Sequence, residues 1–139
     1  MNIFNTLALH IGMESGPPLA DRKSKSAFFT FHEYNIGGLK WALLDIYEGI
    51  LRGNRSHPNR PKPRFRDSDR RILYACINVD PRIHFLVSFL ALSCPKITVL
   101  TTAESEREID FAVSAYLQRF VRINTETCEV SHLQTRTRN

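Results

Sequence analysis

Apolar positions are most concentrated in residues 80–97, DPRIHFLVSFLALSCPKI, which hold the longest apolar run of the chain. Asp80 followed by Pro81 is typical of a helix start, because the carboxylate can accept from free N–H groups and proline's fixed φ suits the first helical position. The apolar positions that follow cover nearly every face of a helix, which is typical of a buried one. We predict a buried central helix over residues 81–92 that ends at Ser93–Pro95.

Helical spacing of apolar residues also predicts helices over residues 2–11, 43–53 and 67–78. A further helix is expected to start at Thr101–Glu104, since T-x-x-E is a capping box, and to continue to Phe120. The polar stretch from Gly12 to Ser26 is rich in glycine and proline, so it is predicted to be a loop.

Short strands are expected between these helices. A hairpin is predicted where residues 28–36 reach the turn Gly37–Gly38 and return through Leu39–Trp41. Residues 97–101 have the β-branched content of a strand, and a final hairpin is expected around the polar turn Asn124–Thr127. The pattern predicts a small, mainly helical α+β domain built around the buried central helix, with short β-hairpins and strands.

The length of 139 residues and the apolar content of 42% fit one domain with its own core. We expect that domain over residues 1–133, followed by a polar basic tail at 134–139. No apolar run is long enough to span a bilayer, and the N-terminus lacks the pattern of a secretory signal. The expectation is therefore a cytoplasmic protein without membrane contact.

Cysteine usage supports that compartment. The cysteines, Cys76, Cys94 and Cys128, are odd in number and widely spaced, with no C-x-x-C motif. This pattern is neither a disulfide framework nor a zinc knuckle, so we expect reduced thiols, no metal site and no cofactor.

The net charge of +5 is concentrated in one segment. Residues 52–71 contain eight Lys and Arg against two acidic residues, a surplus of six. The proline-rich part at 54–66 is predicted to be an exposed loop that would attract polyanions, although Phe65 is its single aromatic residue. The candidate polyanion-binding residues are Arg60, Lys62, Arg64 and Arg66. The alternative is a solvated loop, or one whose arginines pair with acids.

Several motifs occur in an order that resembles a known family. They are DPRIHF at 80–85 with SCP at 93–95, YNIGG at 34–38, ILRGNR at 50–55 followed by His57-Pro58, and AYL at 115–117. Their order and spacing resemble the family called domain of unknown function 547 over roughly residues 2–130. On this resemblance the chain is a divergent copy that lacks segments at both ends. Asn2–Asn5 resembles the family's N-L-Y-N element.

The chain departs from the family at positions that could matter for chemistry. Where relatives usually have a serine and acidic residues, this chain has Ala42, Leu44 and Tyr47. Where they tend to have Asn, Cys and Gly after the histidine, it has Ser88–Leu90. The resemblance therefore implies that proton-transfer groups, a polar group that could orient the histidine and a permissive glycine are lost.

His84 and Cys94 are the candidate catalytic pair of this chain. A papain-like or transglutaminase-like hydrolase or transferase would use Cys94 as nucleophile and His84 as base. If residues 81–92 were one helix, the two side chains would be about 16 Å apart and could not touch. The simpler interpretation is a helix-start histidine and a structural cysteine.

We therefore expect a non-enzymatic interaction or scaffolding domain that binds a protein partner which the sequence does not identify. The resemblance supports this, since the family's domain tends to follow leucine-zipper regions in plants and glutaredoxin and DEP modules in some animal proteins. The alternatives are the Cys94–His84 enzyme and a polyanion-binding surface at residues 52–71.

Overall fold

A computed structural model describes residues 1–16, 22–56, 61–91, 93–127 and 129–132. Its elements, in chain order, are helices α1 (Asn2–Ser15) and α2 (Arg22–Thr30), strands β1 (Glu33–Ile36) and β2 (Leu39–Ala42), the π-helix η1 (Asp45–Leu51), the 3₁₀-helices η2 (Arg70–Tyr74) and η3 (Pro81–Phe85), helix α3 (Ser105–Phe120), and strands β3 (Val121–Asn124) and β4 (Glu129–His132). The predicted α+β class is confirmed. The predicted boundary between a domain and a tail at residue 133 lies where the described residues end.

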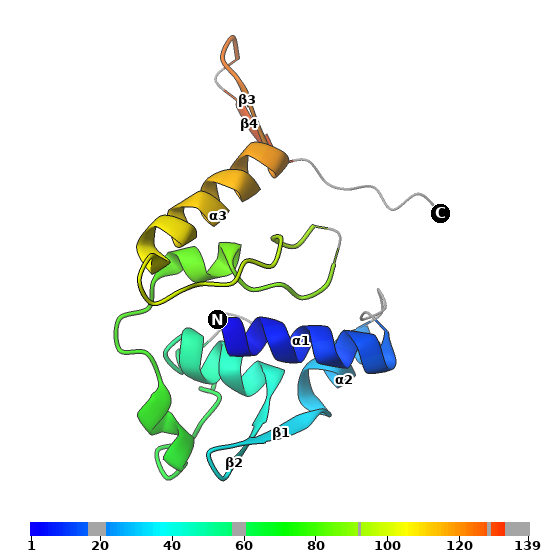
Figure 1. The fold of residues 1–139 in the computed structure, drawn as a ribbon, viewed down its shortest axis with the longest axis vertical. Coiled ribbons are helices and arrows are strands. Elements are labelled where there is room, and N and C mark those ends of the chain that lie inside the picture. Colours follow the sequence, from blue (N-terminus) through cyan, green and yellow to red (C-terminus); the bar gives the residue numbers. More distant parts are fainter. Residues whose placement is uncertain (17–21, 57–60, 92, 128, 133–139) are drawn as a thin grey trace.

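Helix α1 lies in the middle of the molecule (Figure 1). The β1–β2 hairpin lies on one side of it, and η3, the irregular chain after η3 and α3 lie on the other. Phe4, Ala8 and Ile11 of α1 are fully buried, because their spacing of three or four residues places them on one helix face. The core is therefore organised around α1, whereas the sequence suggested residues 81–92.

Both predicted hairpins are present. In the first, Glu33 pairs with Ala42 and Ile36 with Leu39, so that Gly37 and Gly38 form the two-residue turn. Both glycines have positive φ, of 60° and 78°, as the hairpin turn requires. In the second, β3 and β4 pair antiparallel and project from the end of α3 (Figure 1).

The prediction of one helix over residues 81–92 is wrong. η3 ends at Phe85, and the chain then continues without regular structure. The buried side chain of Asn5 explains this path: its Nδ2 donates to the Leu86 carbonyl at 2.9 Å and its Oδ1 accepts from the Ser88 N–H at 3.0 Å. Leu90 then adopts a φ of 57°, which is incompatible with a right-handed helix. The predicted burial is met only in part: Ile83, Leu86 and Val87 are each less than 5% exposed, but Phe85, Phe89 and Leu90 are half-buried and His84 is exposed.

Other boundaries also differ from the prediction. The expected loop from Gly12 to Ser26 contains the end of α1 and the start of α2, and the strand expected at 28–36 is confined to β1. Of the helix predicted at 67–78, the structure forms only η2.

The strand expected at 97–101 is irregular chain. Its end is fixed by Asn2, whose side chain donates from Nδ2 to the Leu100 carbonyl at 2.7 Å and accepts from the Leu100 N–H at 3.0 Å. An asparagine of α1 therefore takes the place of a neighbouring strand.

The helix predicted over 43–53 is present, but most of it winds as the π-helix η1. Gly49 in this helix lies against the fully buried ring of Phe65, where a Cβ would be 2.1 Å from Phe65 Cε2. Gly53 ends the segment with a φ of 64°, and a Cβ there would be 2.5 Å from the Cys76 carbonyl oxygen. Both positions require glycine, and Gly53 gives the ILRGNR stretch a structural role.

Candidate functional site

η3 positions His84. Asp80 caps this short helix, since its carboxylate accepts from the Arg82 N–H at 2.8 Å, and Pro81 follows at the first helical position. The helix start at Asp80–Pro81 was predicted from the sequence, although its length was not. His84 is exposed near the C-terminal end of η3.

Tyr47 of η1 is the partner of His84. The Tyr47 hydroxyl and His84 Nδ1 share a hydrogen bond of 3.0 Å, and the two rings lie edge to face at 6.2 Å. Burial raises the pKa of Tyr47, while the nearby positive charge of Arg52 acts in the opposite direction. The family resemblance marked position 47 only as a departure from the expected pattern, so the Tyr47–His84 pair was missed.

Cys94 has a different environment. Its Sγ accepts a hydrogen bond from the Phe89 N–H at 3.4 Å, and its side chain is partly buried. His84 therefore bonds to Tyr47, while Cys94 bonds to the backbone. A cysteine nucleophile needs a base or positive charge that lowers its pKa. The hydrogen bonds of the two described residues do not join them into a nucleophile–base pair.

The candidate polyanion-binding residues are in different environments. Lys62 and Arg66 are exposed, whereas Arg60 lies outside the described residues. Arg64 instead donates from Nε to the buried Asp45 carboxylate at 2.6 Å. Phe65 beside it is 1% exposed, so this end of the loop is anchored in the core.

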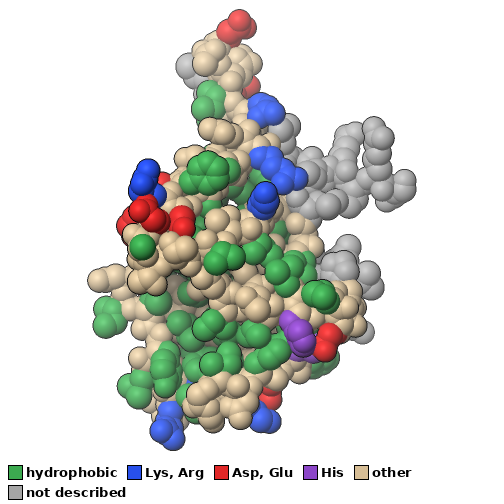
Figure 2. All heavy atoms as spheres, viewed as in Figure 1, with side chains coloured by type: hydrophobic (Ala, Val, Ile, Leu, Met, Phe, Trp, Pro, Cys, Tyr) green, Lys and Arg blue, Asp and Glu red, His purple; other side chains and the backbone are tan. Residues whose placement is uncertain are grey.

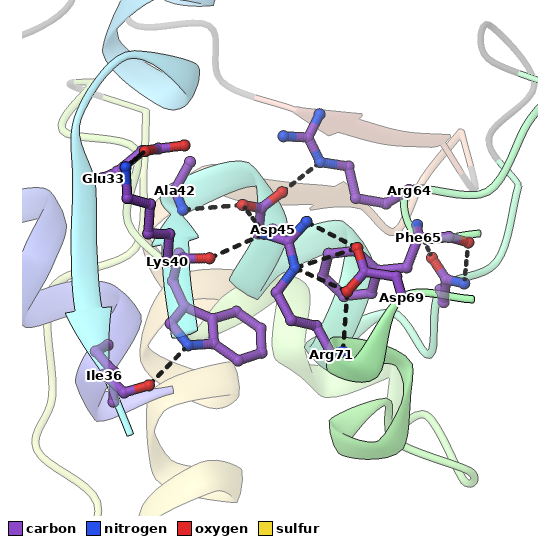
Figure 3. A network of polar contacts seen from close by, with 11 residues as sticks. Glu33, Ile36, Lys40, Ala42, Asp45, Arg64, Phe65, Asp69 and Arg71 are labelled. Carbon is purple, nitrogen blue, oxygen red and sulfur yellow. Dashed lines mark hydrogen bonds and ion pairs between the residues drawn. The ribbon is translucent and has the colours of Figure 1, made fainter. Parts of the chain in front are cut away.

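Asp45 is the centre of a polar network that joins β2, η1 and η2 (Figure 3). It is 4% exposed, and besides Arg64 it accepts from Arg71 Nη1 at 2.9 Å and from the Ala42 N–H at 3.0 Å. Arg71 also bonds the Asp69 carboxylate, which lowers the pKa of Asp69, and lies 4.6 Å over the Phe65 ring. Two cations of the basic segment thus compensate buried or partly buried acids.

Asn54 completes the anchoring of the loop. Its Oδ1 accepts from the Phe65 N–H at 2.7 Å and its Nδ2 donates to the Phe65 carbonyl at 3.0 Å. Its positive φ of 54° is one that asparagine tolerates better than most residues. The asparagine of ILRGNR therefore fixes the backbone of a segment eleven residues further along the chain.

An apolar hollow of about 270 Å³ lies beside Trp41. Its lining residues come from the start of α1, the β1–β2 turn, η1 and η2, and are Met1, Ile3, Ile36, Gly37, Trp41, Ile46, Ile50, Leu51 and Tyr74. On the face shown in Figure 2, hydrophobic side chains gather over α1 and the elements below it. The periodicity of the sequence could not reveal this hollow, because its walls come from four separate segments.

Among the described residues, no group of three or more His, Cys, Asp or Glu side chains is arranged to hold a metal ion. Within the same residues, no helix is long and apolar enough to cross a bilayer.

The structure is a small α+β domain. Asparagine side chains of α1 and an aspartate side chain of η1 form hydrogen bonds with irregular segments of the chain and hold them in place. The protein-family model described as "Protein of unknown function, DUF547" matches residues 1–117, and the chain belongs to this family. No curated protein and no solved structure matched the chain.

Proposed function

We propose that this chain is a non-enzymatic domain that binds a protein partner in the cytoplasm through the apolar hollow beside Trp41. The observation that carries the proposal is the exposure of the hollow's apolar rim: Ile3 is 55% exposed and Tyr74 is 57% exposed. Exposed apolar surface around a concave site is typical of a place where a partner inserts an apolar anchor side chain. The occupant that fits is an aliphatic or aromatic side chain of a peptide segment.

The composition of the walls supports this occupant. Trp41 presents its ring to the hollow, while its indole N–H already donates to the Ile36 carbonyl at 3.1 Å. Tyr74 packs edge to face on Trp41 at 5.7 Å. Because the indole N–H is satisfied within the protein, the hollow offers mainly hydrophobic contact, and burial of an apolar side chain there would be favourable.

The hydrogen bonding of Cys94 supports the non-enzymatic part of the proposal, since His84 is paired with Tyr47. The thiols of Cys76 and Cys94 are free, which favours a reducing compartment such as the cytoplasm. A second proposal is weak polyanion binding by the basic, proline-rich loop at residues 54–66, supported by the exposed Lys62 and Arg66.

The test is selection of peptide ligands on the whole chain from a random library displayed on phage. Trp-free peptides that are selected can be titrated by fluorescence, because Trp41 is the only tryptophan of the chain. We expect the rim substitutions Ile3→Asp and Tyr74→Asp to weaken binding about tenfold or more, since each places a charge where an anchor is desolvated. Thermal unfolding of each variant checks that the fold is retained.

The matched control is Ile77→Asp, which changes an apolar residue that is 90% exposed and does not line the hollow. It should leave peptide affinity unchanged. Peptides that bind the rim variants as tightly as the unaltered chain, or a selection that yields no peptide with an apolar anchor, would refute the proposal.

A further inference from the structure

Helix α3 carries a second apolar surface, which is separate from the Trp41 hollow. Phe111, near the middle of the helix, is 73% exposed. It lines a groove of about 430 Å³ between α3 and residues 96–98, and also an adjoining hollow of about 330 Å³ toward the start of α3. A phenylalanine at the junction of two hollows can serve as an anchor for a partner.

Charge changes sign along this surface. Glu104, Glu108, Phe111, Ala115 and Arg119 follow one another at intervals of three or four residues, so they share one face of the helix. The N-terminal end of the surface is lined by two glutamates and Arg107, and the C-terminal end by Arg119 together with Lys96.

The space-filling view agrees with this distribution. Figure 2 shows acidic side chains, with a basic one among them, gathered near the start of α3, and basic side chains near its end. Arg107 bonds to Glu104 at 3.2 Å. The Glu108 carboxylate accepts from the Thr101 N–H and hydroxyl, contacts that fix its position but leave its negative charge.

We propose that this face of α3 binds the same face of a second copy of the chain, with the two helices antiparallel. A two-fold axis perpendicular to the helix places the start of one α3 on the end of the other, so the acidic end of each copy meets the basic end of its partner. A parallel arrangement would place like charges together. The order acidic, apolar, basic is therefore complementary to itself only in the antiparallel pairing.

The apolar centre of the surface fits the same arrangement. Because Phe111 lies near the midpoint of Ser105–Phe120, the two copies of this ring meet close to the two-fold axis. Ala115 on the same face is exposed and small, which lets two helix backbones approach. Each helix of 16 residues is about 24 Å long, which gives room for one central contact and two charged ends.

The test is the dimer dissociation constant of the whole chain, measured by sedimentation equilibrium over a range of concentrations. Glu104→Lys places Lys against Arg119 at both ends of the pair, and Arg119→Glu places two acids together in the same way. Each variant alone should dimerise about tenfold more weakly or worse. An equimolar mixture of the two variants should restore dimers, since every end then meets an opposite charge.

The restored mixture also shows that both variants fold. Phe111→Asp should remove the dimer, and Ile77→Asp, at another exposed apolar position outside the groove, should not. The proposal is overturned if the unaltered chain is a monomer at every concentration, if Phe111→Asp dimerises normally, or if the mixture does not restore what the single variants lose. None of these outcomes depends on a ligand in the Trp41 hollow.

Discussion

Asp45 is a buried carboxylate whose charge is compensated by two residues that are distant in the sequence. Arg64 and Arg71 lie 19 and 26 residues after it, and each donates to one of its oxygens. The Ala42 N–H donates to the same carboxylate, so Asp45 supplies one half of a capping box even though position 42 has no hydroxyl. A buried charge with three donors is well satisfied, and removing one donor leaves part of the desolvation cost uncompensated.

The main effect of the Arg64→Ser substitution should therefore be a loss of stability and not a loss of affinity for polyanions. We expect a loss of about 2 kcal/mol in the free energy of unfolding, because a charged hydrogen bond to a buried acid is removed while Arg71 remains. Urea unfolding followed by Trp41 fluorescence measures the loss. Lys62→Ser, two residues earlier and exposed, is the matched control and should change stability by less than about 0.5 kcal/mol.

The Ser variants of Lys62, Arg64 and Arg66 separate the structural role of the loop at residues 54–66 from its proposed role in polyanion binding. Heparin affinity, if present, should fall in Lys62→Ser and Arg66→Ser and should weaken with salt. If Arg64→Ser were as stable as Lys62→Ser, the ion pair with Asp45 would contribute nothing measurable and Arg64 would return to the candidate polyanion surface.

At the scale of elements, η3 and α3 are joined by one arginine. Arg82 of η3 bonds Asp80 at 2.6 Å and also bonds Glu106 at 2.8 Å and Asp110 at 2.7 Å, both on α3. The guanidinium of Arg82 holds the pKa of Asp80 below its usual range. Leu86, just after η3, packs with Ile109 and Ala112 of α3, so a polar and an apolar contact reinforce each other.

This pKa shift predicts a pH dependence of stability. A carboxyl group whose pKa is lower in the folded state stabilises the protein above its unfolded pKa, and that contribution is lost as the pH falls through the folded pKa. Asp80→Asn keeps an oxygen for the helix cap but removes the charge. We expect its Tm to lie about 2–5 °C below that of the unaltered chain at pH 7.

The difference should persist down to about pH 4 and vanish at lower pH, where Asp80 itself becomes protonated. Scanning calorimetry at several pH values gives both curves. Asp67→Asn, which removes an exposed acid outside this cluster, is the control. A Tm difference that is the same at pH 7 and pH 2 would show that the charge of Asp80 does not contribute.

Elements specified by local chemistry were predictable, and those specified by distant contacts were not. The Gly37–Gly38 hairpin and α3 follow from turn residues and helical spacing. Thr101 also acts near the start of α3, since its hydroxyl accepts from the Glu104 N–H, although the returning carboxylate is that of Glu108 and not that of Glu104. These features depend on residues within one or two turns of each other.

The segment after Phe85 shows the opposite case. Its spacing is helical, but the side chain of Asn5, more than eighty residues away, forms hydrogen bonds with the Leu86 carbonyl and the Ser88 N–H. These backbone groups are then not available for helical hydrogen bonds. Leu90 adopts a positive φ, and it stands at the position where the family resemblance implied a glycine. That comparison was the one sequence signal for a break, because a left-handed conformation favours glycine.

At the scale of the whole molecule, α1 holds the two sides of the domain together. Its buried residues contact the core, and Asn2 and Asn5 bond Leu100 and residues 86–88 through their side chains. The candidate catalytic residues lie on the side of the domain that these asparagines fix. Sequence reasoning found His84 and Cys94, but it could not find Tyr47 as the partner of His84, since that contact joins segments 37 residues apart.

We propose that this fold presents binding surfaces and does not activate Cys94 as a nucleophile. The most direct measurement is the rate of Cys94 alkylation by iodoacetamide at pH 7 in a Cys76→Ser, Cys128→Ser background, where Cys94 is the only thiol. We expect the native chain to react more slowly than the urea-unfolded chain, and His84→Ala to leave the native rate unchanged. Fast, stoichiometric labelling of native Cys94 that His84→Ala abolishes would contradict the claim and identify a Cys–His pair.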